Sequence, residues 1–483
     1  MSSAPSTNEA VCQPENTSAQ IDASCRLPLL VIFGSSAAWL VISAILGLIA
    51  SVKMHSPKLL ADCPFFTYGH VQAGAFNTLL YGFVAQAAIG VMLWLIARLG
   101  RTTLVQGGFA AVGAIFWNLG VTLGLIGIMI GDGSGYEWFE FPKYAAPVLL
   151  VGYVLMGLVA GFTFGSRKNE EMYPSQWFLL AAIFWFPWIY ITAVALIHWF
   201  PAVGVMQAVV HQWYAHNLVV VWLGSIGIAT AYYLVPKLAG KPLASYNHAL
   251  VSFWFLLLFG GMGGMHHGMP VPAWLPSLST VMAFLLVGPV LAFIVNLHGT
   301  LYDDGGKVPA SLTLNFVLAG SVALIVGILM KAIGAVPQIS DITHFTYFTA
   351  AQSKLMLFGF ASLILLGAIY YILPRVAGVE WPLAGALKGH FYLGTIGAAV
   401  LVLPLALGGV QQGLKLASPT DFMEVTKAAM MGFRLSTLGD LLWLAGSLAL
   451  LVNVKLLVYR MVKAQALACM AEAQTAKTRE ATV

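Results

Sequence analysis

Long apolar runs recur between residues 27 and 460, and short polar or Pro/Gly-containing segments separate them. A helix of about 20 apolar residues crosses the bilayer core of about 30 Å and satisfies its own backbone hydrogen bonds in lipid. The pattern therefore predicts an all-α, polytopic integral membrane bundle of about 12 transmembrane helices. The predicted spans are 27–52, 74–99, 104–131, 144–166, 176–200, 206–235, 248–268, 276–301, 310–334, 344–374, 389–413 and 432–460.

The ends of the chain differ from this apolar body. Residues 1–26 are polar, and no basic stretch precedes the first apolar run, so we predict a disordered cytoplasmic tail and not a cleavable signal peptide. No linker divides residues 27–460, which predicts one transmembrane domain. Residues 461–483 are predicted to form a cytoplasmic C-terminal tail.

Charge is scarce and unevenly placed. Hydrophobic residues make up 59% of the chain and charged residues 8%, so the predicted partner is the lipid bilayer. The net charge of +5 is spread over loops without a basic, aromatic-rich patch, which argues against nucleic acid. Basic residues such as Arg98, Lys168 and Arg375 fall on the face that both termini share. The positive-inside rule then places both termini in the cytoplasm of a bacterial-type cytoplasmic membrane.

Three histidines lie in segments that suggest a metal site. His216 lies in the segment Gln-Trp-Tyr-Ala-His-Asn, and His266 and His267 close a glycine-rich helix end. Ionisable side chains within the membrane are costly, and neutral imidazole is a common ligand of copper, zinc and iron. Adjacent residues on a helix diverge by about 100°, so the neighbouring glycines must loosen the helix before both imidazoles can face one ion. The alternative is a pair of packing histidines beside a hinge.

These segments resemble a known family. Together with 232–237, 296–301, 367–375 and 389–397, they are similar to subunit I of the cbb-type (C family) cytochrome c oxidases in the heme-copper oxidase superfamily. The resemblance implies a subunit I-like twelve-helix fold in which His216, His266 and His267 bind copper opposite a high-spin heme b. It also implies electron transfer from cytochrome c-type subunits to oxygen with proton uptake. This chain has no Cys-x-x-Cys-His motif for a c-type heme of its own, so those subunits are expected on other chains.

The heme-ligand positions differ from the family pattern. The family has a histidine on its second helix and a His-x-His pair on its tenth, and the matching positions here are Ala75, Gln352 and Lys354. Alanine and glutamine cannot replace imidazole on iron, and lysine can do so only when deprotonated. The nearest substitutes are His70 and His344, displaced by about 7 and 15 Å along their helices.

Two further positions bear on the chemistry. Gly260 stands where the family has the active-site tyrosine that supplies a proton and an electron for O–O cleavage. Nitric oxide reductases of the superfamily also lack that tyrosine, but they carry a glutamate at the position of Val220. Gly260 therefore weakens the expectation of oxygen chemistry, and Val220 weakens the expectation of nitric oxide chemistry.

Lys354 itself needs an explanation, because an unpaired ammonium within the membrane costs several kcal/mol. We predict that Lys354 and Gln352 fill space that the family gives to heme. Asp440 is the best candidate partner for Lys354, and Arg434 is the local residue that would compete with Lys354 for Asp440.

Four functions remain open. The first is a cytochrome c oxidase subunit with copper and heme b. The second is a heme-deficient paralogue that keeps a three-histidine copper site and acts as a structural or copper-handling subunit beside a complete catalytic paralogue. The third is a nitric oxide reductase-like subunit. The fourth is a transporter-like bundle, in which the glycine-rich interruption lines a path.

Overall fold

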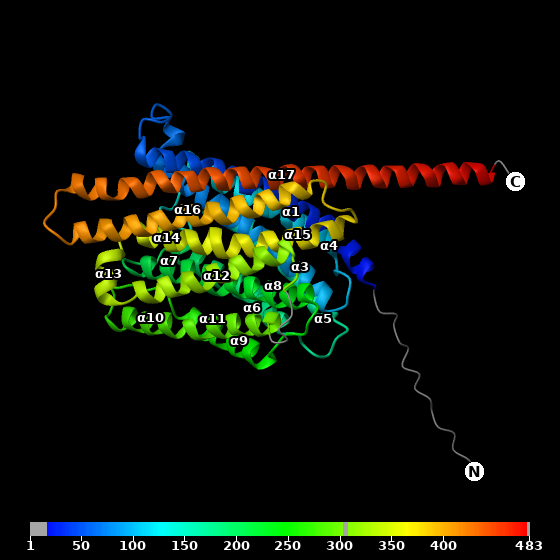
Figure 1. The fold of residues 1–483 in the computed structure, drawn as a ribbon, viewed down its shortest axis with the longest axis horizontal. Helices are drawn as coiled ribbons and strands as arrows, with labels where there is room; N and C mark the ends of the chain where they lie inside the picture. The colour runs from blue at the N-terminus through cyan, green and yellow to red at the C-terminus, as the bar shows by residue number, and fades with distance from the viewer. Residues whose placement is uncertain (1–16, 303–307, 481–483) are drawn as a thin grey trace, which may run out of the picture.

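The computed structural model describes residues 17–302 and 308–480, and within those ranges it contains helices and no strand. The helices pack side by side as one elongated bundle (Figure 1). The prediction of an all-α membrane bundle is therefore confirmed.

The helices follow one another without large insertions. In chain order they are α1 (Ser18–His55), α2 (Tyr68–Asn77), α3 (Gln86–Leu99), α4 (Gly107–Met129), α5 (Ala145–Gly165), α6 (Pro174–Ala193), α7 (Met206–His216), α8 (Gly224–Ala239), α9 (Tyr246–Gly261), α10 (Trp274–Leu285), α11 (Val287–Tyr302), α12 (Leu312–Gly334), α13 (Pro337–Thr343), α14 (Tyr347–Lys354), α15 (Leu363–Ala377), α16 (Ala384–Leu416) and α17 (Phe422–Glu480).

Eleven continuous helical spans in the described ranges are long and apolar enough to cross a bilayer. The twelfth predicted span, 248–268, corresponds to α9, which has 16 residues and ends at Gly261. At 1.5 Å per residue, α9 covers about 24 Å, less than the bilayer core. The helix is shorter than predicted because the glycine-rich segment after Gly261 leaves the helical path, and His266 and His267 therefore lie outside it.

Both predicted tails are partly helical. α1 begins at Ser18 with a capping box in which Thr17 and Gln20 satisfy each other's backbone N–H groups, so residues 18–26 are not the disordered segment that the sequence suggested. Residues 1–16 lie outside the described ranges. α17 continues through the predicted C-terminal tail as far as Glu480 and extends well past the other helices (Figure 1). The start of α1 and the end of α17 lie at the same end of the bundle.

Three spans form the centre of the bundle, and each contains a π-helical segment. These segments are η2 (Thr78–Ala85) between α2 and α3, η4 (Asn217–Leu223) between α7 and α8, and η5 (Leu355–Ser362) between α14 and α15. In an apolar 18-residue window of each of these spans, 100%, 94% and 89% of the residues are buried, against 33–61% in the other eight spans. π-Helical turns are rare and are frequent at functional sites. Here η4 starts directly after His216, η5 starts directly after Lys354, and η2 starts three residues after Ala75.

Candidate functional site

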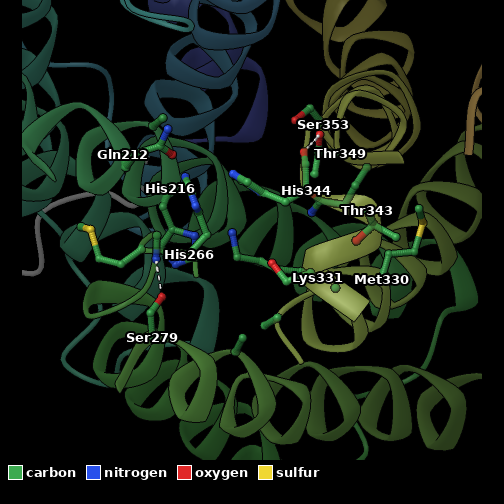
Figure 2. Close-up of a pocket in the computed structure, with 18 of the residues that line it drawn as sticks. Gln212, His216, His266, Ser279, Met330, Lys331, Thr343, His344, Thr349 and Ser353 are labelled. Atoms are coloured by element: carbon green, nitrogen blue, oxygen red, sulfur yellow. Dashed lines mark hydrogen bonds between the residues drawn. The ribbon is translucent and has the colours of Figure 1, made fainter. Parts of the chain in front are cut away.

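A cavity of about 490 Å³ lies where the ends of α7, α12, α13 and α14 meet the segment after α9. Its polar lining includes His216, His266, His267, Lys331, His344 and Gln352. Figure 2 shows His216, His266, His344 and Lys331 around the same space. The sequence predicted that His216 and the His266-His267 pair meet, and the structure places all three in this lining.

His216 is the most buried of these histidines. Its side chain is 6% exposed, and neither ring nitrogen has a hydrogen-bond partner. The glycine-rich segment packs directly on it: a Cβ at Gly263 would lie 2.3 Å from the His216 Nε2. Gly264 has φ +113°, and a Cβ there would lie 2.8 Å from the Gln212 carbonyl oxygen. Glycine is therefore required for this close approach, and the two unpartnered nitrogens indicate a missing polar partner.

His266 and His267 point to different partners. The His266 ring lies against the His344 ring, with centroids 3.6 Å apart, whereas the His267 Nε2 lies 3.3 Å from the Thr280 hydroxyl. The His266 Nδ1 contacts the His267 carbonyl oxygen at 3.0 Å. The sequence offered His344 as a displaced heme ligand, whereas the structure places it in the histidine group around His266.

Among the described residues, no three histidine, cysteine, aspartate or glutamate side chains lie close enough together to hold a metal ion. The site of His216, His266 and His267 therefore stays a prediction. The chemistry of the donors suits a metal, since burial and the neighbouring His266 lower the pKa of His344 to about 4 and keep its imidazole neutral at neutral pH.

Two charged residues of the lining were not identified from sequence as site residues. Lys331, in the last turn of α12, points toward His266 and His344 (Figure 2). Glu137 comes from the loop between α4 and α5, and its backbone carbonyl accepts a hydrogen bond from the His211 ring at 2.5 Å. Lys331 thus adds a basic group to the histidine lining of the cavity.

The same loop folds back onto the central helices. Glu140 accepts a hydrogen bond of 2.7 Å from the Asn77 amide on α2. Tyr81 donates to the Trp138 carbonyl oxygen at 2.8 Å, and its hydroxyl lies 2.6 Å from that of Tyr214. Burial of the Glu140 carboxyl raises its pKa to about 7. The loop between α4 and α5 therefore packs against the central helices and contains a buried acid, Glu140.

The two positions of the family's His-x-His pair face different cavities. Gln352 lines the large cavity, and its amide donates to the Gly327 carbonyl oxygen at 3.4 Å. Lys354 lines a separate cavity of about 20 Å³ together with Ala75 and Asp440. Residues two apart on a helix point about 200° apart, which explains the divergence. Asp440 is 5% exposed, whereas Arg434, which would compete with Lys354 for Asp440, is exposed.

The remaining candidates do not restore the family pattern. His70 lies at the start of α2, where its Nδ1 contacts the Pro64 carbonyl oxygen at 3.2 Å, outside both cavities. A Cβ at Gly260 would lie 2.8 Å from a Val221 methyl group, so valine side chains close the space for a larger residue there. Val220, at the position of the reductase glutamate, lines the large cavity.

Comparison with known proteins defines the class. The family profile described as cytochrome c and quinol oxidase polypeptide I matches residues 28–442. The chain is 25% identical over 431 residues to the CcoN1 subunit of a cbb3-type cytochrome c oxidase from Stutzerimonas stutzeri, covering 86% of this chain and 91% of that protein. It is 24% identical over 442 residues to a cytochrome c oxidase subunit 1 homolog from Azorhizobium caulinodans, covering 87% and 80%.

Two further proteins are similar to this chain. A nitric oxide reductase subunit from Stutzerimonas stutzeri is 24% identical over 423 residues, covering 83% of this chain and 79% of that protein. A cryo-EM structure of a heme-copper terminal oxidase dimer matches the fold with a TM-score of 0.74 at 14% identity, covering 90% and 84%. The fold is thus that of heme-copper oxidase subunit I, an integral multi-pass membrane protein. The chain belongs to the cytochrome c and quinol oxidase polypeptide I family.

The family implies heme and copper, and the residues present fit these groups unequally. The 20 Å³ space beside Ala75 and Lys354 holds about one water molecule, far less than a porphyrin. In the large cavity, Gln352 offers an amide where an iron ligand is expected. A histidine-ligated heme therefore does not fit these positions. The unpartnered nitrogens of His216 fit a metal ion better.

Proposed function

We propose that this chain is a heme-deficient member of its family and serves as a subunit of a multi-subunit respiratory membrane complex. The relatives are named as cytochrome c oxidase subunits, which supports cytochrome c-type subunits and a complete catalytic subunit I as partners. The observation that carries the proposal is the closed space between Ala75 and Lys354, at the place where the family holds a heme.

The retained large cavity supports copper handling as its role. His216 offers two unpartnered nitrogens, and His266 and His344 lie beside the same space. Neutral imidazoles bind copper well, and a site without a heme opposite it keeps that metal available for transfer or structural use. The excess of basic residues on the face shared by the termini supports a cytoplasmic location for both ends.

The test is a pyridine hemochrome assay combined with metal analysis on the purified full chain. We expect heme well below one per chain and copper near one per chain. A His216→Ala variant should lose the copper, whereas His70→Ala, which changes a histidine outside both cavities, should keep it.

Each other outcome replaces the proposal by a named alternative. Stoichiometric heme b with copper would show a working oxidase subunit with unrecognised ligands. Heme with a non-heme iron and no copper would indicate a nitric oxide reductase-like protein. Absence of both heme and metal would support the transporter-like alternative.

A further inference from the structure

The small cavity brings two opposite charges together within the bundle. Lys354 reaches it from α14 and Asp440 from α17, and Ser43 and Gln72 add a hydroxyl and an amide. The Asp440 Oδ2 has no hydrogen-bond partner although the residue is only 5% exposed. A buried carboxylate oxygen without a donor is costly, so the site needs an additional donor.

The cavity has the right size for that donor. About 20 Å³ exceeds the 10–15 Å³ that one water molecule requires, and such a water needs two to four polar partners. Asp440, Lys354, Ser43 and Gln72 provide those partners. No ion pair within 4.0 Å joins Lys354 to Asp440 among the described residues, and a water between them would complete the contact.

A line of hydroxyl groups leads from Asp440 to one face of the bundle. Ser51 follows Gly47 by four residues on α1, so it lies on the same helix face one turn beyond the residue that approaches the Asp440 Oδ1. The Ser51 hydroxyl is 2.8 Å from the Thr437 hydroxyl, which in turn lies 3.1 Å from the His55 Nε2. His55 ends α1 beside the exposed residues that follow it, at the end of the bundle opposite the termini.

Space for this line comes from the packing of α1 on α17. A Cβ at Gly47 would lie 3.9 Å from both the Asp440 Oδ1 and the Ala75 Cβ, so the carboxylate sits between α1 and α2. Eight residues separate Gly47 from His55, which corresponds to about 12 Å of depth. On the other side of the cavity, the Phe358 ring packs edge-on against Trp443 with centroids 4.9 Å apart. Polar side chains thus lie on one side of the cavity, and aromatic rings lie on the other.

We propose that Lys354, Asp440 and one water molecule form a proton-binding ion pair in the place of the family's heme, and that it exchanges protons with the face opposite the termini through Ser51, Thr437 and His55. A proton enters at the His55 imidazole. Each hydroxyl then accepts a proton on one side as it releases one on the other, so the relay ends unchanged. Asp440 gains the proton and becomes a neutral carboxylic acid beside the Lys354 ammonium.

Few other charges face the pair. On α1, Lys53 donates to the Leu59 carbonyl oxygen and His55 is the relay's entrance. On α17, Arg434 is exposed. α2 contributes the neutral Gln72, Ala75 and Phe76 to the cavity, and η5 contributes Phe358. The charge balance of the cavity therefore rests on Lys354 and Asp440.

Infrared spectroscopy after a rapid drop in pH tests the proposal on the purified full chain. We expect a carboxylic acid C=O band to appear, and Asp440→Asn should remove it. Lys354→Met should show the band already at neutral pH, because a buried carboxyl without its cation keeps its proton. A wild-type spectrum without any band that depends on Asp440 would overturn the proton-binding pair.

The rate at which the carboxylic acid band appears tests the relay through Ser51, Thr437 and His55. Thr437→Val removes the central hydroxyl at nearly constant size and should slow the band by about tenfold, equivalent to about 1.4 kcal/mol in the barrier. Ser436→Ala is the matched control, since the neighbouring Ser436 bonds to the Leu401 carbonyl oxygen on α16 instead. Equal rates in wild type and Thr437→Val would overturn the assigned path. The Lys354→Met/Asp440→Asn double variant, which leaves no unpaired charge, shows whether loss of a band reflects loss of folding.

Discussion

The imidazole rings of His266 and His344 lie with their centroids 3.6 Å apart, although they come from distant parts of the sequence. This contact moves His344 from the heme side of the site to the side of the predicted metal. The group that faces the large cavity therefore has four histidines, His216, His266, His267 and His344, instead of three.

If His344 assists metal binding, His344→Ala should weaken copper binding by roughly tenfold or more, as loss of a supporting residue does at other metal sites. The measurement is a competition titration of the purified protein against a copper chelator. His70→Ala serves as the control because His70 lies outside both cavities. Unchanged affinity in His344→Ala would restrict the site to the three histidines predicted from sequence.

Restoring the ligands alone should not restore a heme. The Ala75→His/Lys354→His variant places imidazoles at two of the three family positions, the two that line the small cavity. The space between them is about 20 Å³, and Phe76, Leu79 and Phe358 close it. We expect the pyridine hemochrome of this variant to stay at the level of the wild type. A gain of one heme per chain would show that ligand loss, and not closure of the space, keeps heme out.

Gly264 should be sensitive to substitution for two reasons that can be separated. Gly264→Ala combines a positive φ with a Cβ 2.8 Å from the Gln212 carbonyl oxygen, so we expect a loss of about 1–3 kcal/mol in stability. Gly268→Ala also has a positive φ, of +86°, but no atom within 4 Å, and should cost only about 1 kcal/mol. Thermal unfolding in detergent measures both. Equal losses would mean that the contact with the His216 segment is unimportant.

Glu140 should make stability depend on pH. Its pKa rises from 4.5 to about 7 on folding, so the folded chain holds this proton more tightly than the unfolded chain. The stabilising protonated form is fully present below pH 4.5, and the contribution is lost as the pH rises through about 7. We expect the wild type to lose about 2 kcal/mol relative to Glu140→Gln across this window, less than the full shift implies because the side chain retains some solvent contact.

Thermal unfolding of wild type and Glu140→Gln at several pH values checks this prediction. The two curves should converge at acid pH and separate toward neutral pH. Parallel curves would show that Glu140 remains ionised in the folded protein.

The bundle was predictable because its helices are long, apolar and separated by polar punctuation. Two local features were also visible: the Thr17–Gln20 capping box that starts α1, and the glycines that end α9. Polar residues surround the capping box, and this polar composition favours a disordered segment over a helix. The contacts of His344 and Lys331 with the histidine group depend on packing between α12, α13 and the segment after α9, and periodicity along one helix does not reveal such packing.

The π-helical segment η4 changes which way the side chains point on its two sides. A π turn holds an extra residue, which rotates the following side chains by about 100° relative to an uninterrupted helix. His216 before η4 faces the cavity, while Tyr232 beyond it packs between Phe178 and Phe293 of neighbouring helices. The two halves of this span thus differ in rotational phase. Deleting a single residue from Asn217–Leu223 would rotate one half by about 100° against the other and turn its buried side chains toward different neighbouring helices.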